Sequence, residues 1–172
     1  MKIKISFALY FLFFSSYSQQ FRDASTIADL SQYYNNNGVA VADYDQDGDL
    51  DIFLVGYEVQ PNNQKSRLLE NTNNGNFIDV TEATGINQNL NHQITLPSGF
   101  YFGDRLSASW GDFNNDGYPD LFLGNSVQSE LYKNNGDGSF TNITESAGFQ
   151  VTCDDCYITG ALWLDYDLDG YL

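Results

Sequence analysis

Hydrophobic residues gather in short runs along the chain, and turns rich in Asp, Asn and Gly separate them. Between Ser107 and Thr144 there are four such runs, at 108–111, 121–124, 130–133 and 139–144. Each run is shorter than an ordinary helix, and turn residues bound it on both sides. The pattern predicts four short antiparallel strands.

The same unit recurs along the chain. VAVADYDQDGDLDIFL, from Val39, returns as ASWGDFNNDGYPDLFL from Ala108 and as ALWLDYDLDGYL from Ala161. A second element alternates with it: FIDVTEATGI from Phe77 returns as FTNITESAGF from Phe140. A repeated four-stranded unit is typical of β-propeller blades. A β-sandwich has strands of similar length but does not need its turns repeated in register. We therefore predict an all-β fold, a partial β-propeller of about two and a half four-stranded antiparallel blades.

Residues 1–18 have the features of a secretory signal peptide. Lys2 and Lys4 precede an apolar run at 5–14, and Ser16 and Ser18 are small residues at the positions a signal peptidase reads. A membrane anchor is the alternative, but about ten apolar residues are fewer than the ~20 that span a bilayer. We expect cleavage after Ser18, no membrane span, and a mature chain at 19–172 that is secreted, either extracellular or at the cell surface.

Composition narrows the function classes. The chain has 23 acidic and 7 basic side chains, a formal net charge of −16, which excludes a nucleic-acid-binding module. Hydrophobic residues make up 42%, too many for a disordered acidic tail. The acids are mostly Asp, a turn former, which again favours strands joined by tight turns.

Three acidic loops in the repeats carry the candidate chemistry. Each loop has oxygen-bearing side chains at its first, third and fifth positions and glycine at its sixth, and two loops add Asp51 or Asp120 at the ninth. Alternate residues of a tight turn point inward, so these oxygens converge, and six or seven oxygen ligands suit Ca²⁺. No cluster of His or Cys accompanies them, which weighs against zinc or copper. We therefore expect calcium as the cofactor.

Two alternatives to a calcium loop can be weighed on the sequence. An EF-hand requires Glu at position 12, where this chain has Leu54 or Leu123 inside an apolar strand. A metal-free Asp/Gly hairpin is reasonable for one loop but not for three in register. Eleven of the 23 acids lie in these loops, and carboxylates so crowded repel one another without counterions.

These residues resemble a known family. Phe102-Gly103 and the segment 107–124 are similar to the FG-GAP/VCBS repeat of integrin alpha-subunit propellers, and the segment 140–148 resembles that of cartilage acidic protein-like and ASPIC/UnbV-type secreted proteins. The resemblance implies a seven-bladed propeller with calcium between the first two strands of a blade, and roles in adhesion. It implies these ligands, with Asp49, Tyr118 and Tyr171 giving backbone oxygens: Asp43, Asp45, Asp47, Asp49, Asp51, Asp112, Asn114, Asp116, Tyr118, Asp120, Asp165, Asp167, Asp169 and Tyr171.

Other features have simpler interpretations. Cys153 and Cys156 form a C-x-x-C pair outside any βαβ context, which favours a local disulfide over redox work. Asn142-Ile-Thr144 is a glycosylation sequon on a predicted strand, and His92 is expected to be a solvated loop residue within an insertion at 87–101. The third loop stops before its ninth position, so we expect the sequence to be the N-terminal part of a longer protein. Residues 21–30 are a weak copy of the second element, and we expect them to complete the last blade of the propeller in that longer protein.

The function that we expect is a secreted calcium-binding propeller module for extracellular protein interaction or adhesion. A carbohydrate-binding propeller is one alternative, since aromatic residues are frequent. The non-catalytic part of a secreted polysaccharide-degrading enzyme is another. No catalytic constellation emerges, because the loops account for every Asp cluster. The chain is therefore not expected to be an enzyme, and its partner is expected to be an extracellular protein or glycan.

Overall fold

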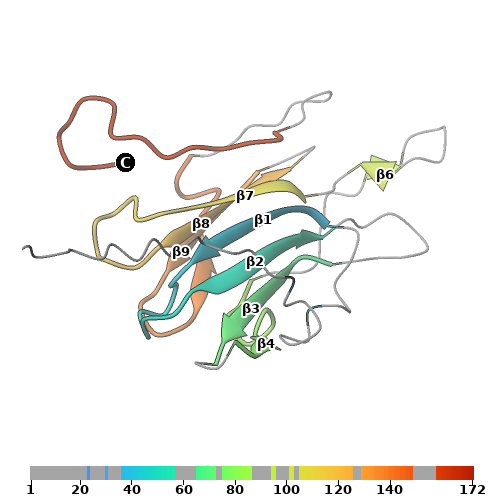
Figure 1. Cartoon of the computed structure of the whole chain (residues 1–172). Helices are drawn as coiled ribbons and strands as arrows, with labels where there is room; N and C mark the ends of the chain where they lie inside the picture. The colour runs from blue at the N-terminus through green and yellow to red at the C-terminus, as the bar shows by residue number, and fades with distance from the viewer. Residues whose placement is uncertain are drawn as a thin grey trace, which may run out of the picture.

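A computed structural model describes residues 23, 30, 36–56, 65–72, 75–86, 94–95, 101–102, 105–125, 129–148 and 158–172. Within them, two four-stranded antiparallel sheets stand side by side (Figure 1). The first has the order β1-β2-β3-β4, with bounds Asn36–Ala42, Asp51–Gly56, Arg67–Asn71 and Phe77–Asp79. The second contains β7 to β10 in sequential order, with bounds Arg105–Gly111, Asp120–Asn125, Glu130–Asn134 and Phe140–Asn142.

The two sheets repeat each other in detail. In each, the acidic loop closes the hairpin between the first two strands, where Ala42 pairs with Asp51 and Gly111 with Asp120. Each first strand also has a register irregularity near its start, at Asn36/Gly38 and at Arg105/Ser107. The predicted all-β fold and the four strands between Ser107 and Thr144 are confirmed. Each sheet is one contiguous unit of sequence, which is consistent with partial propeller blades.

The hydrophobic core lies between the two sheets and draws on both. Trp110 of β7 bridges them, with its ring 6.4 Å from that of Phe53 and 6.0 Å from that of Phe140. Ala40, Val80, Ala108 and Trp110 pack around a buried cluster formed by Tyr44, Phe53, Val55, Leu68, Ile86, Leu121, Leu123, Tyr132 and Phe140. This burial against a neighbour explains why the repeat needs more than one copy.

A short polar motif ends each sheet's outer strand. Asn142 Oδ1 accepts hydrogen bonds from the amide and the hydroxyl of Thr144, at 3.1 and 2.7 Å. Asp79 Oδ1 does the same for Thr81, at 3.1 and 2.5 Å. Both threonine Oγ1 atoms in turn accept a buried amide of the neighbouring strand, from Leu68 or Leu131. The sequon Asn142-Ile-Thr144 is therefore part of a turn that both units share.

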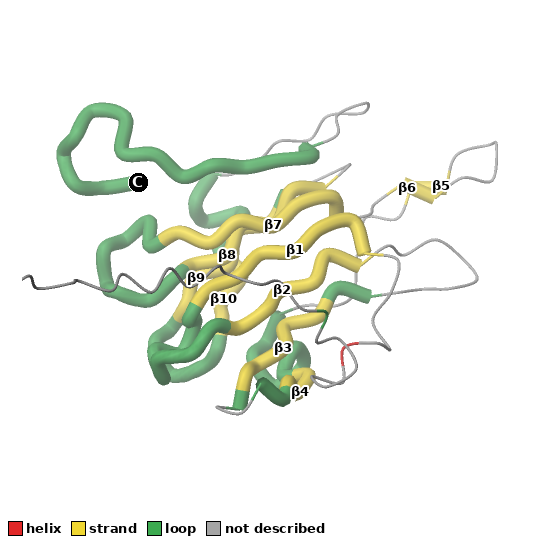
Figure 2. The backbone as a smooth tube through the Cα atoms, in the orientation of Figure 1, coloured by secondary structure: helices red, strands yellow, loops and turns green. Residues whose placement is uncertain are grey.

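Residues 158–172 run beside β7 without forming a strand (Figure 2). Ile158 O accepts a hydrogen bond from Ser107 Oγ at 3.1 Å, and Trp163 stacks on Phe113 with ring centroids 6.2 Å apart. The third copy of the repeat, from which a partial third blade was expected, forms no strand at 161–172. A strand needs hydrogen-bonding partners for its amides and carbonyls. In the neighbouring sheet, β8 pairs with β7 on one side and with β9 on the other, so it has no free edge for this segment.

Part of the insertion at 87–101 is described, as a two-stranded ladder of β5 (Ile94–Thr95) and β6 (Tyr101–Phe102). The predicted signal peptide, His92 and the pair Cys153 and Cys156 lie outside the described residues, as does nearly all of 21–30. In the part of the chain that is described, no helix is both long enough and apolar enough to cross a membrane.

Candidate metal centre

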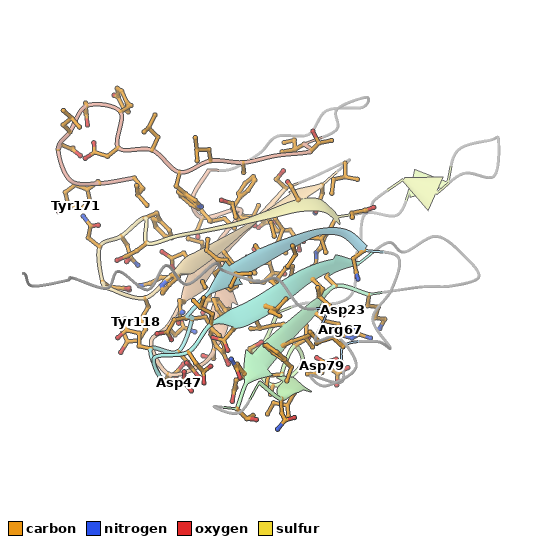
Figure 3. The ribbon with its side chains drawn as sticks, in the orientation of Figure 1. Asp23, Asp47, Arg67, Asp79, Tyr118 and Tyr171 are labelled. Atoms are coloured by element: carbon orange, nitrogen blue, oxygen red, sulfur yellow. The ribbon has the colours of Figure 1, made fainter. Side chains whose placement is uncertain are left out.

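The three acidic loops lie in a row at one end of the sheets. Loop 1 (43–51) joins β1 to β2, loop 2 (112–120) joins β7 to β8, and loop 3 (165–172) follows the segment beside β7. Asp47, Tyr118 and Tyr171 mark the three loops in Figure 3. Segments far apart in the sequence thus present their acidic turns on the same edge of the molecule.

Carboxylates converge in two of these loops. Asp43, Asp45 and Asp47 each offer an oxygen within 4.8 Å of the others, and Asp165, Asp167 and Asp169 repeat this arrangement. Burial, opposed by the hydrogen bond from the Asp47 amide and reinforced by the charge of Asp47, raises the pKa of Asp45. Such convergence is unfavourable for bare carboxylates and suits a hard cation.

Loop 2 differs because its third position is an amide. Asn114 Oδ1 accepts the Asp116 amide at 2.9 Å, and Asn114 Nδ2 donates to Asp116 Oδ2 at 2.9 Å. Lys133 also lies beside Asp116, with Nζ 3.8 Å from Oδ2. In loop 2 an amide nitrogen and a lysine ammonium therefore lie beside the carboxylate of Asp116, which is the group that a bound cation would also contact.

Glycine at position six shapes all three turns. Gly48, Gly117 and Gly170 have φ of 95°, 93° and 91°, a conformation that favours glycine. Their amides donate to the first aspartate of the loop, at 3.1 Å to Asp43, 2.8 Å to Asp112 and 2.9 Å to Asp165, always through Oδ2. The first carboxylate is thus oriented by the turn itself.

Several carboxylate oxygens of loop 1 have no hydrogen-bond donor among the described residues. They are Asp43 Oδ1 and both carboxylate oxygens of Asp49, all of them buried atoms. A buried acceptor without a donor is unfavourable. Asp43 belongs to the convergent group, so a cation bound there would offer a partner to its carboxylate, and the residues present fit a calcium ion.

The ninth-position aspartates have a second task, which the sequence did not reveal. Asp51 accepts the amides of Tyr44 at 3.2 Å and Asn71 at 2.9 Å, and Asp120 accepts those of Phe113 at 3.1 Å and Asn134 at 2.8 Å. Burial raises the pKa of each carboxyl to about 6, against these hydrogen bonds, which lower it. Each aspartate fastens its loop to the third strand of its sheet.

Asp51 and Asp120 stay predicted ligands, because a carboxylate oxygen can accept more than one partner. The signal that could have revealed the structural role is their position, since each begins a strand whose residues are mostly buried. The seventh-position residues Asp49, Tyr118 and Tyr171 each donate their amide to the fifth-position aspartate, at 3.0, 3.1 and 2.9 Å. Coordination by their carbonyl oxygens stays a prediction.

Comparison with known proteins bears on the second and third loops. Residues 112–172 match the family described as FG-GAP-like repeat. This match begins at the first aspartate of loop 2 and includes β8 to β10 and loop 3. The chain matches none of the curated proteins. With its two four-stranded sheets, the chain carries an FG-GAP-like repeat over residues 112–172, consistent with an FG-GAP repeat protein.

Proposed function

We propose that this chain is a secreted, calcium-binding module of propeller-type repeats that serves extracellular protein interaction or adhesion. The observation that carries the proposal is the convergence of Asp43, Asp45 and Asp47 within 4.8 Å, with Asp43 Oδ1 buried and without a hydrogen-bond donor among the described residues. The same convergence in loop 3 makes a chance arrangement of surface acids a poor explanation.

Calcium would act here as a structural ion. Loops 1 and 2 each join two strands at one end of the sheets, so an ion there would neutralise negative charge and hold the hairpin in place. An ion that binds the folded chain stabilises it by mass action. The signal-like residues 1–18 support export to a compartment where calcium is plentiful, and disulfides persist there too.

Calorimetric titration of the full mature chain with CaCl₂ tests the metal part of the proposal. We expect binding that Asp45→Ala and Asp116→Ala each reduce by one site, and a melting temperature that rises with calcium. Asp137→Asn is the matched control, because Asp137 is an exposed aspartate in a glycine turn outside the three loops. Absence of calcium binding at millimolar concentration in folded protein would contradict the proposal.

The interaction part is tested with the calcium-loaded chain on arrays of extracellular matrix proteins and of glycans. We expect protein binding that is lost in EGTA. A glycan signal that survives high salt would instead favour a carbohydrate-binding module.

A further inference from the structure

A hydrogen bond joins each acidic loop to the next. In loop 1 the side chain at position four, Gln46, donates from Nε2 to the carbonyl oxygen of Gly117 in loop 2, at 2.5 Å. In loop 2 the residue at position four, Asn115, donates from Nδ2 to the carbonyl oxygen of Gly170 in loop 3, at 2.5 Å. The two junctions use the same pair of positions, although 71 and 55 residues separate the partners.

The backbone at position four directs this contact. Gln46 and Asn115 have φ of 63° and 56°. These values lie in the left-handed region, which residues other than Gly, Asn and Asp seldom adopt. The equivalent residue of loop 3, Leu168, has φ of 62°. The conformation therefore belongs to the loop, and leucine accommodates it without an amide to donate.

The accepting peptide group connects directly to a predicted ligand. The peptide between Gly117 and Tyr118 accepts Gln46 through its oxygen and donates through its nitrogen to Asp116 Oδ1, at 3.1 Å. The peptide between Gly170 and Tyr171 does the same between Asn115 and Asp169, at 2.9 Å for the second bond.

Gln46 is itself flanked in sequence by the predicted ligands Asp45 and Asp47. A continuous path thus runs from the carboxylates of one loop, through one side chain and one peptide group, to a carboxylate of the next.

We propose that Gln46 and Asn115 couple the three loops, so that cation binding in one loop favours cation binding in the next. They are positioning residues, because neither is a ligand. This inference rests on the proposed calcium binding. An ion that draws Asp45 and Asp47 together fixes the backbone of Gln46, and the fixed side chain then holds the 117–118 peptide for Asp116. Such coupling is reciprocal, so occupancy of loop 2 favours loop 1 by the same factor.

A double-mutant cycle, followed by NMR on the ¹⁵N-labelled mature chain titrated with CaCl₂, tests the coupling. The amide of Gly117, which donates to Asp112 Oδ2, reports loop 2, and that of Gly48 reports loop 1. We expect Asp45→Ala to weaken calcium binding at loop 2 by about 5-fold or more. In the Gln46→Leu background the same substitution should leave loop 2 unchanged.

One further variant, Gln46→Asn, guards the result. Gln46→Leu copies the residue found at position four of loop 3, and Gln46→Asn copies that of loop 2 and should restore the coupling. The coupling would be overturned, with calcium binding left intact, by either of two results. Asp45→Ala could weaken calcium binding at loop 2 equally in the wild-type and Gln46→Leu backgrounds, or it could leave that binding unchanged in both. If neither Gly48 nor Gly117 shifts with calcium, calcium binding itself fails, and the coupling fails with it.

Discussion

Asn134 of β9 donates a hydrogen bond from Nδ2 to the carbonyl oxygen of Tyr44, at 2.8 Å, across 90 residues of sequence. The same nitrogen donates to Pro119 O within its own unit, at 3.1 Å, and Asn134 is fully buried. One side chain thereby ties the second sheet to the acidic loop of the first. The interface between the sheets is polar at this point and apolar around Trp110.

Removal of this tie should destabilise the packing of the two sheets. Asn134→Ala deprives the buried carbonyl of Tyr44 and the partly buried carbonyl of Pro119 of that donor, which costs about 1–3 kcal/mol of unfolding free energy. Asn71→Ala is the matched control. Asn71 occupies the same position in the first sheet and bonds within its own unit, to Leu50 O at 3.3 Å. Urea denaturation checks both variants, and equal losses would contradict the role in the interface.

Substitutions at the ninth and third positions of loop 1, Asp51 and Asp45, should distinguish a structural role from a ligand role. Asp51→Asn replaces one of two accepting oxygens by a donor that faces a buried amide, so we expect a loss of about 1–3 kcal/mol even in EGTA. Asp45→Asn keeps an acceptor for Asp47 and should change stability in EGTA little, while it weakens the response to calcium. A calcium-free Asp51→Asn chain as stable as wild type would refute this assignment.

The stability of the calcium-free chain should depend on pH through Asp51 and Asp120. Burial raises the pKa of each in the folded state from 3.8 to about 6, so the folded chain binds these protons more tightly than the unfolded chain. Their contribution is fully present below pH 3.8 and is lost as the pH rises through about 6. Urea titrations in EGTA at several pH values check this. As the pH rises through about 6, the unfolding free energy should fall less in Asp51→Asn than in wild type, and a larger fall in the variant would contradict the prediction.

A buried ion pair should matter far more than an exposed one. Arg105 is buried and its Nε lies 2.9 Å from Glu130 Oε2, so Glu130→Gln removes the negative charge from a hydrogen bond to a buried cation and should cost about 1.5–3 kcal/mol. The pair of Arg67 and Asp79, 2.8 Å apart, is partly exposed, and Asp79→Asn should cost less than about 1 kcal/mol. Thermal unfolding distinguishes the two, and similar shifts in melting temperature would be evidence against the argument.

The local features of the fold could be predicted from the sequence, because each rests on neighbouring residues. The hairpin turns follow from glycine after alternating acids, as at Gly48 and Gly117, and the strands follow from the short apolar runs beside them. The converging carboxylates of loops 1 and 3 follow from the same spacing. Partners distant in the chain could not be predicted. Gln46 is exposed and polar, so nothing local distinguishes it from an ordinary turn residue.

The double role of Asp51 was hidden for a similar reason. Its partner Asn71 lies on the third strand, and only the sheet brings the two together. The third copy of the repeat shows the converse limit, because residues 161–164 carry its apolar pattern but form no strand, since strand pairing depends on a second segment.

The turn shared by Asn142 and Asp79 has a practical consequence for work on this chain. Since aspartate already fills this place in the first unit, with the same two hydrogen bonds to its threonine, Asn142→Asp should be accepted by the backbone without rearrangement. That substitution removes the only atom to which an oligosaccharide could be attached at 142. It therefore offers a way to produce a uniform sample from a eukaryotic host, with the hydrogen-bonding of the outer strand preserved.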